Sequence, residues 1–268
     1  MEKIVEEIKE QSFLDHLEVL RWHLIRSSAA VLLFTVLVFI FPEILFDQII
    51  FAAKDPSFAT YRFFCWMSEI IHFGEALCID EMPFELMNIN MSGQLSTHII
   101  SSMAAGFIIA FPYIFWEIWR FVKPALNDGE KKYSRGVVFY TSLLFTMGVL
   151  FGYYAVAPLS VQFLGNYQVS LEVVNQINLN SYISTVTTVC LANGIVFLLP
   201  VLIYFLSKLG LITPSFLRQY RRHSLVILMI LAAVITPPDI MSLILVTFPL
   251  ILLYEVSIKV SAKFQDKE

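Results

Sequence analysis

Residues 27–42 read SSAAVLLFTVLVFIFP, an uncharged stretch that lies between Arg26 and Glu43. Extended by Leu24 and Ile25, the stretch approaches the ~20 residues that a helix needs to cross ~30 Å of hydrocarbon. The chain as a whole has the same character, since 57% of its 268 residues are hydrophobic, 15% are charged and the mean hydropathy is +0.72. This composition excludes an ordinary water-soluble domain and predicts an all-α, polytopic membrane protein.

Six apolar stretches are separated by charged connections. The predicted spans are residues 24–45, 97–119, 137–160, 182–207, 223–236 and 240–256. Together they form a single transmembrane domain over residues 1–268, with an amphipathic segment at 1–23 and a large loop at 46–96.

The last two spans are short, and Pro237, Pro238 and Asp239 stand between them. One helix through these residues would lose two backbone donors in lipid and place a charge at mid-depth, which costs several kcal/mol. Two short helices that turn here avoid both costs, with Asp239 free to cap the second helix at the wet surface. We therefore expect two short helices in a locally thinned bilayer.

Prolines and glycines are expected to shape the other spans. Pro112, Pro200 and Pro249 lie inside spans two, four and six, where proline bends a helix packed in a bundle. Gly148 and Gly152 form a GxxxG pair on span three, and packing within the bundle is favoured over a homodimer contact.

Basic residues predict the orientation. Of the 18 Lys and Arg residues, all except Lys54 and Arg62 fall on the chain ends or on the connections of one side. The positive-inside rule then places both termini in the cytoplasm and residues 46–96 outside. No cleavable signal peptide is predicted, because the first fifteen residues are polar and acidic.

The outer loop contains Cys65 and Cys78, whereas Cys190 lies in span four. On the oxidising side of a bacterial envelope the first two could form a disulfide, and two buried free thiols are the alternative. Residues 58–77 have amphipathic spacing, which predicts a helix over the outer surface, and residues 162–180 read as a capping loop.

Motifs of catalysis are missing from the sequence, which has no HExxH, GxSxG, Gly-rich phosphate loop or CxxC. We therefore expect neither an enzyme nor a metal or cofactor site. Ionisable residues deep in the spans are nearly absent, with Glu117 as the exception near the inner end of span two. This pattern disfavours an ion-coupled transporter.

Two cytoplasmic segments concentrate polar chemistry. Residues 12–26, SFLDHLEVLRWHLIR, form an amphipathic helix that carries Asp15, Glu18 and Arg21. In residues 116–135, WEIWRFVKPALNDGEKKYSR, Pro124 ends a helix and a turn leads to Glu130. Interfacial anchoring by Trp, Lys and Arg is the alternative reading of both segments.

At these residues the chain resembles the TatC family, the polytopic receptor subunit of the twin-arginine protein translocase. FLDHLEVLRWHL at 13–24 is similar to the family's F-x-x-H-L-x-E-L-R-x-R-L, and FWEIWRFVKPALNDGEKK at 115–132 resembles its first cytoplasmic loop. ITPPDIMSLILVTFPLILLYEVSI at 235–258 is similar to the family's T-P-P-D, membrane-embedded Pro and terminal Tyr-Glu.

The resemblance implies a receptor for twin-arginine signal peptides, and the core subunit of a translocase that exports folded proteins across the bacterial inner membrane. It also implies single-span TatA/TatB-type partner subunits and self-association in the lipid bilayer, with no cofactor and no nucleic acid. The alternative from another class is a small-molecule or ion transporter.

The signal-peptide-binding residues that the resemblance implies are Glu130, Glu18, Asp15, Arg21 and Pro124. Carboxylates suit this ligand because they accept the rigid fork of a guanidinium bidentately. Glu130 matches the acidic position of the loop. The N-terminal acid of the family falls on Val19, and Glu18 lies one residue earlier, a helix rotation of ~100°.

A second group of residues is implied to support the fold or to contact a partner helix. They are Pro200, Pro237, Pro238, Asp239 and Glu255. The chain departs from the family at Leu198 and Leu243, where polar residues are expected, which weakens a polar contact to a partner at mid-depth.

Overall fold

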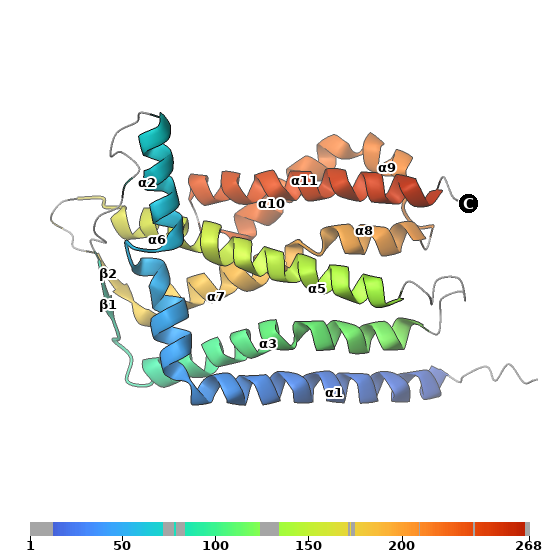
Figure 1. Cartoon of the computed structure of the whole chain (residues 1–268), viewed down its shortest axis with the longest axis horizontal. Helices are drawn as coiled ribbons and strands as arrows, with labels where there is room; N and C mark the ends of the chain where they lie inside the picture. The colour runs from blue at the N-terminus through green and yellow to red at the C-terminus, as the bar shows by residue number, and fades with distance from the viewer. Residues whose placement is uncertain are drawn as a thin grey trace, which may run out of the picture.

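The structure, a computed structural model, describes residues 13–71, 78, 84–123, 134–170, 172, 175–208, 210–237 and 239–265. The helices that run along the bundle are α1 (Phe13–Ile40), α3 (Gly93–Val122), α5 (Ser134–Phe151), α7 (Leu179–Val196), α8 (Leu199–Lys208), α10 (Arg221–Ile235) and α11 (Ile240–Gln265) (Figure 1). The other helical elements are η1 (Ile44–Ile50), η2 (Phe51–Lys54), α2 (Ala59–Ile71), η5 (Gly152–Val156), α6 (Ala157–Asn166) and α9 (Pro214–Gln219). The strands β1 (Glu85–Met87) and β2 (Gln176–Asn178) form one parallel pair.

Five helical segments of the described chain are long and apolar enough to cross a membrane. They are Leu17–Ile40, Gly93–Val122, Gly136–Asn166, Leu179–Lys208 and Ile240–Ala262. α10 is shorter, because its 15 residues rise only about 22 Å. The prediction of an all-α, multi-pass membrane protein is confirmed.

The chain turns between α10 and α11, as the prolines predict. α10 ends at Ile235, and α11 starts at Ile240. The first helix of this pair is short, as expected, but the second has 26 residues and continues to Gln265. The expectation that the last helix is short was therefore wrong.

α11 continues past the charged residues Glu255 and Lys259 because one face of its last turns is still buried. Ser257, Ile258 and Ser261 are buried, and the Ser261 hydroxyl shares a 2.6 Å hydrogen bond with Ser207 of α8. The contact with α8 thus stabilises the helix beyond the point where its apolar run ends.

Two of the predicted spans are irregular at their prolines. Before Pro158, the helix widens into the π-helical η5, because proline has no N–H and its ring crowds the carbonyl four residues earlier. That carbonyl, of Tyr154, accepts a hydrogen bond from the Thr60 hydroxyl. The predicted fourth span is likewise divided into α7 and α8, with Pro200 at the second position of α8. Pro112 and Pro249, by contrast, lie inside continuous helices.

The helices α5 and α7 approach each other closely through glycines. A Cβ on Gly148 would lie 2.6 Å from the carbonyl oxygen of Asn193, and one on Gly152 would lie 3.0 Å from that of Val189. From the other side, a Cβ on Gly194 would lie 2.7 Å from a methyl group of Val149. The GxxxG pair of span three therefore packs inside the bundle, as predicted.

α3 extends this core and supports α1. The ring of Phe111 on α3 stacks on Phe145 of α5 with centroids 3.6 Å apart. On its other side α3 packs along α1, which lies at the edge of the bundle (Figure 1). A Cβ on Gly106 of α3 would lie 2.6 Å from the backbone nitrogen of Thr35, so the two helices nearly touch there.

The end of the bundle away from the chain termini is closed by tyrosine hydrogen bonds. The Tyr182 hydroxyl donates to the Ile50 carbonyl at 2.8 Å, and the Tyr61 hydroxyl lies 2.9 Å from the carbonyls of Ala53 and Pro158. Burial raises the pKa of Tyr61, so its hydroxyl remains a donor. These bonds fasten the segment after α1 onto α6 and α7.

The helix predicted over residues 58–77 is present as α2 over Ala59–Ile71, across this same end of the bundle (Figure 1), and residues 72–77 lie outside the described residues. Cys65 of α2 forms a disulfide with Cys78, 13 residues further along the chain, while Cys190 is buried and free. Of the two alternatives for Cys65 and Cys78, the structure therefore has the disulfide and not two free thiols. Residues 162–180 are not only a loop, since they include the end of α6 and the strand β2.

We predict that Gly148→Ala destabilises the protein, because the added Cβ would force α5 and α7 apart, at a cost of about 1–3 kcal/mol. Thermal unfolding of the detergent-purified protein measures this as a lower midpoint. Gly136→Ala, on the same helix, is the matched control, because its nearest neighbour would be a Tyr140 ring carbon at 4.0 Å. Equal midpoints for the two variants would contradict the close packing.

Candidate functional site

The two ends of the bundle differ in charge. At one end, which we name the basic end, α1 begins, α3 and α8 end, α10 begins and α11 ends (Figure 1). The basic residues of these helix ends and connections whose side chains the structure describes are Arg21, Arg26, Arg120, Lys123, Lys208, Arg218, Arg221, Arg222 and Lys259. Lys54 and Arg62 belong to η2 and α2, at the opposite end. The basic residues that the sequence places on one side of the predicted spans thus also lie at one end of the folded bundle.

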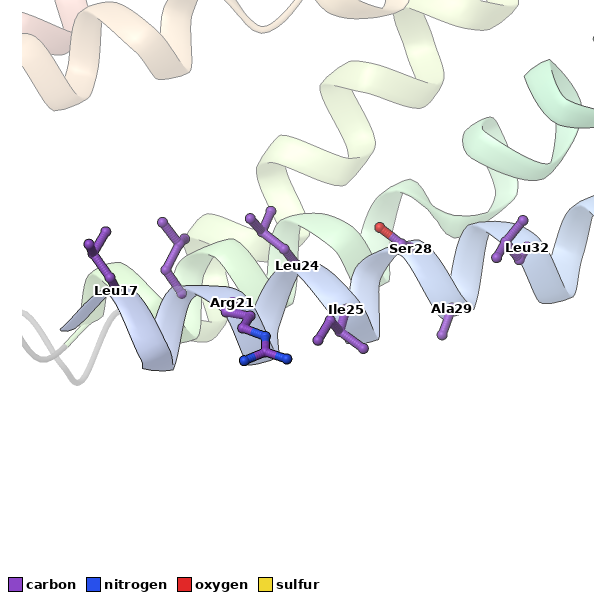
Figure 2. Close-up of a pocket in the computed structure, with 8 residues that line it drawn as sticks. Leu17, Arg21, Leu24, Ile25, Ser28, Ala29 and Leu32 are labelled. Atoms are coloured by element: carbon purple, nitrogen blue, oxygen red, sulfur yellow. The ribbon is translucent and has the colours of Figure 1, made fainter. Parts of the chain in front are cut away.

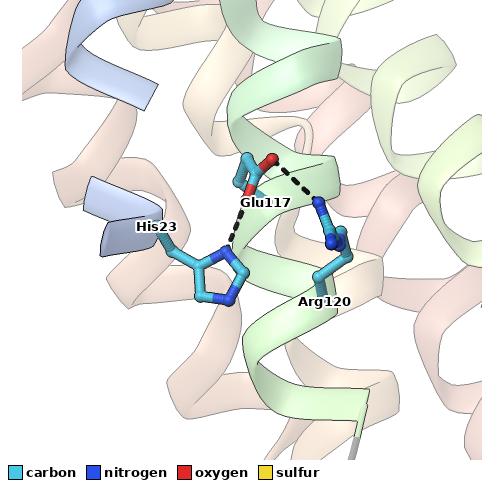
Figure 3. Close-up of polar contacts among 3 residues, drawn as sticks. All are labelled: His23, Glu117 and Arg120. Carbon is cyan, nitrogen blue, oxygen red and sulfur yellow. Dashed lines mark hydrogen bonds and ion pairs between the residues drawn. The ribbon is translucent and has the colours of Figure 1, made fainter. Parts of the chain in front are cut away.

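A charged network joins α1 to α3 at the basic end (Figure 3). Oε2 of Glu117 pairs with Nδ1 of His23, and Oε1 accepts a hydrogen bond from Nη1 of Arg120 at 3.3 Å. The Glu117 side chain is only 1% exposed, compared with 13% for His23. Because a buried carboxylate is stable only with cationic or hydrogen-bonding partners, this network fixes α1 against α3.

Arg120 connects the network to the surface. Its side chain is 46% exposed, and its guanidinium carbon lies 4.9 Å from the ring of Trp116, which is itself exposed. A guanidinium over an aromatic face gains a cation–π interaction. Arg120 therefore has two neighbours to bind, the Glu117 carboxylate and the Trp116 ring.

The first turns of α1 carry the predicted N-terminal site. Asp15 lies near the start of the helix, and both Glu18 and Val19 are exposed. Val19 and His23 are four residues apart, so they share one face of α1, whereas Glu18 is rotated by ~100°. The position where the family pattern has an acid therefore lies one turn from the His23–Glu117 pair.

Arg21 lies beside a shallow apolar groove on the free side of α1 (Figure 2). The residues that line the groove are Leu17, Leu20, Arg21, Leu24, Ile25, Ser28, Ala29 and Leu32. In the close-up the guanidinium points away from the bundle, on the same side of α1 as Ile25 and Ala29. Arg21 and Glu117 are therefore not brought together.

The loop that follows α3 holds the other predicted binding residues. The described part of the chain reaches Lys123 there and resumes at Ser134. Pro124 and Glu130 consequently lie outside the described residues, and their assignment stays a prediction. Arg120, in the last turn of α3, is the described charged side chain of the network nearest to this loop in sequence.

Asp239 caps α11, but it is buried rather than placed at a wet surface. Its Oδ1 accepts a 2.6 Å hydrogen bond from the backbone N–H of Ser242, and its Oδ2 lies 3.4 Å from the Ser160 hydroxyl. The side chain is 4% exposed. The expectation of an exposed cap was wrong because α6 packs over the turn and supplies Ser160 as an additional donor.

The remaining predicted support residues are dispersed. Pro200 is buried near the start of α8, Pro237 is partly buried in the turn, and Pro238 lies outside the described residues. Glu255 of α11 accepts a 2.8 Å hydrogen bond from Arg221 of α10 at the basic end. These residues do not form one site with Glu117.

Glu117 stands out in the sequence as an unusual charge in a span, but the sequence does not indicate which residue is its partner. The signal was present in the residue types, because a carboxylate in the last turns of a membrane helix needs a cation nearby. His23, on the apolar helix that enters span one, is the partner that Glu117 contacts, across two helices that are far apart in the sequence. Pairing at such a distance cannot be read from helical spacing.

In the part of the chain that the structure describes, no three His, Cys, Asp or Glu side chains gather in a way that could hold a metal ion. The contacts at the basic end are instead those of a carboxylate with a guanidinium group and of that guanidinium group with an indole ring.

We predict that Asp239→Ala lowers the free energy of unfolding by about 1–2 kcal/mol, because α11 loses its N-terminal cap. Asp239→Asn should lose less, since its amide oxygen can still accept from Ser242. The exposed Asp47, replaced by Ala, is the control and should leave the thermal midpoint unchanged. A midpoint for Asp239→Ala equal to that of the Asp47 variant would show that the cap is unimportant.

Comparison with known proteins gives consistent matches. The family described as Sec-independent protein translocase protein (TatC) matches residues 15–249. The chain is 41% identical over 256 residues to the Sec-independent protein translocase protein TatC of Blattabacterium sp. subsp. Periplaneta americana, covering 95% of this chain and 96% of that protein. It is 34% identical to the TatC protein of Aquifex aeolicus over 91% of this chain and 92% of that one. A crystal structure of the twin-arginine translocase receptor TatC in DDM superimposes with a TM-score of 0.70 at 34% identity, over 91% of this chain and 97% of that one.

Proposed function

The chain belongs to the TatC family of Sec-independent protein translocase proteins, and we propose that it is the twin-arginine signal-peptide receptor and core subunit of a translocase for folded proteins. The observation that carries this proposal is the match along nearly the whole chain to a crystal structure of a twin-arginine translocase receptor. A role in protein transport without enzymatic activity is part of the same proposal. The comparisons do not support the alternative of a small-molecule or ion transporter.

The proposed binding residues lie at the basic end or next to it in sequence. Glu130 and Pro124 belong to the loop after α3, and Glu18, Asp15 and Arg21 belong to the first turns of α1. Since α1 and α3 pack side by side, their ends at the basic end are neighbours (Figure 1). A peptide with two adjacent arginines can thus reach carboxylates from both segments. Guanidinium forks favour such acceptors more than lysine ammonium groups do.

We propose a bacterial inner membrane location with six spans and both termini in the cytoplasm. Three features support this arrangement: the basic residues share one end, the chain enters α1 and leaves α11 at that end, and the disulfide lies near the other. Basic residues favour the cytoplasmic side, and disulfides persist on the oxidising side. In this arrangement α10 is the short fifth span.

Single-span TatA/TatB-type subunits and further copies of this chain are the proposed partners within the bilayer. Pro200, Pro237, Pro238, Asp239 and Glu255 are the residues proposed to shape or support that contact. Leu198 and Leu243 are apolar, so the contact is expected to depend on packing more than on polar pairing at mid-depth.

For the receptor role, we predict that Glu130→Gln weakens binding of a twin-arginine peptide on the order of a hundredfold, because a charge-assisted bidentate pair is lost. Glu18→Gln should have a much smaller effect, since Glu18 is turned ~100° away from the face of Val19. Val19→Glu should tighten binding. Titration of the purified protein with a labelled peptide measures all three.

A twin-lysine peptide is the ligand control, and it should bind weakly to every variant. Unchanged twin-arginine affinity in the Glu18, Glu130 double variant would remove the proposed carboxylate site.

For the orientation, we predict that a membrane-impermeant maleimide labels Val169→Cys in intact cells and labels Gln219→Cys only after permeabilisation. Both positions are exposed and lie at opposite ends of the bundle. A Cys190→Ala background removes the free thiol, and the disulfide cysteines do not react. Labelling of the Gln219 position in intact cells would reverse the orientation.

A further inference from the structure

The charged network of Glu117 has no place among the residues that the family resemblance singles out. The family pattern has an acid at the position of Val19 and an arginine at that of His23. In this chain the carboxylate beside position 23 comes instead from α3, as Glu117, and it already holds a guanidinium, that of Arg120. The basic end therefore contains a carboxylate whose chemistry matches the ligand of the proposed receptor.

We propose that Glu117 is a second arginine-binding carboxylate of the receptor, and that Arg120 occupies the place of a peptide arginine while no peptide is bound. The inference rests on the proposed function, because it assigns this carboxylate to the twin-arginine ligand. Binding exchanges one guanidinium for another at Oε1 of Glu117, and His23 stays on Oε2.

The two contacts of Glu117 differ in a way that supports an exchange. The contact with His23 joins the buried Glu117 to a largely covered side chain, 13% exposed, across α1 and α3. The contact with Arg120 is a single one of 3.3 Å, longer than the ~2.7–2.9 Å of a well-formed pair between a cation and a carboxylate. Arg120 is thus the weaker of the two partners, and it is the one that faces solvent.

Arg120 also has a second binding partner when it leaves the carboxylate. Its guanidinium already lies 4.9 Å from the exposed Trp116 ring, which can hold it by a cation–π contact. The exchange also keeps the charge of the buried site constant, because the carboxylate is never without a cation. Loss of the partner from a buried charge is what makes such pairs costly to break, and here that cost is avoided.

The surroundings of the carboxylate fit one incoming arginine. The charged or titratable groups that act on Glu117 are His23, Tyr113 and Arg120, and none of them is a second carboxylate. Tyr113 of α3 and His23 of α1 also hydrogen-bond the carboxylate, and Arg120, 46% exposed, is the partner that an incoming arginine would replace. An arginine that enters there lies one helical turn from the Val19 position and near the end of α3, which Glu130 follows in the sequence.

A purely structural role for the network predicts a different result for Arg120. If Glu117 only fixes α1 to α3, removal of Arg120 weakens the network, and peptide affinity falls or stays the same. If Arg120 competes with the peptide, its removal raises affinity, by about tenfold for the loss of one charge-assisted hydrogen bond. The sign of the effect separates the two roles.

The experiment is a double-mutant cycle on the full chain in detergent or nanodiscs, titrated with a labelled twin-arginine peptide and its twin-lysine counterpart. Arg120→Gln should bind the twin-arginine peptide about tenfold more tightly, and Glu117→Gln should bind it about tenfold more weakly. In the double variant the gain from Arg120→Gln should disappear, because the carboxylate for which it competes is gone. Arg221→Gln, which removes an arginine paired with Glu255 at the same end, is the matched control and should leave affinity unchanged.

Three outcomes would overturn the inference. The first is that Arg120→Gln binds the twin-arginine peptide more weakly or unchanged. The second is that Arg120→Gln raises the affinity equally when Glu117 is already replaced by Gln. The third is that Arg221→Gln raises the affinity as much as Arg120→Gln does, which would indicate only a general reduction of positive charge. Thermal midpoints of all variants identify any loss of folding, and Arg120→Gln is informative even if Glu117→Gln fails to fold. Failure of the receptor role is recognised separately, because then the unmodified chain and Glu130→Gln would bind the twin-arginine peptide equally.

Discussion

The close approach of α5 and α7 is the contact on which the rest of the bundle depends. Gly148 on α5 and Gly194 on α7 leave no room for a side chain between the two backbones, and Gly152 at the start of η5 leaves very little. Within a membrane there is little hydrophobic drive to bring helices together, so such dispersion contacts hold the bundle. α3 packs on this pair through Phe111, and α1 in turn packs on α3. The proposed receptor surface is thus the outermost layer on a tightly packed centre.

Among the described residues, the two buried carboxylates lie at opposite ends of the bundle. At the basic end, α1 is joined to α3 by the buried carboxylate of Glu117, and at the other end Asp239 holds the turn before α11. Each carboxylate is buried and supplied with partners from more than one element. A carboxylate in this situation joins two elements only while its partners remain, which makes both places sensitive to substitution.

Much of this arrangement follows from the sequence, because the bilayer restricts what a chain can do. Uncharged runs of spanning length, the Pro237 turn and the glycine contact were predicted from periodicity, backbone donors and side-chain size. The length of α11 was not, because its last turns are stabilised by Ser261 against α8 and not by its own apolarity. The burial of Asp239 and the pairing of His23 with Glu117 depend on which helices become neighbours. That information lies in the packing, and no local pattern contains it.

The short parallel pair β1–β2 limits how this molecule can move. β1 leads into α3 and β2 leads directly into α7, and the register Glu85↔Gln176 to Met87↔Asn178 fixes the starts of both helices at the same level. A piston-like slide of α3 along α7 would have to break this ladder, whereas a change of tilt would leave it intact. Any motion of α3 relative to α7 that keeps this ladder would be a tilt about the strand pair, and its amplitude would grow along the helix toward Arg120. Such a tilt would displace most the end of α3 at which the peptide is proposed to bind.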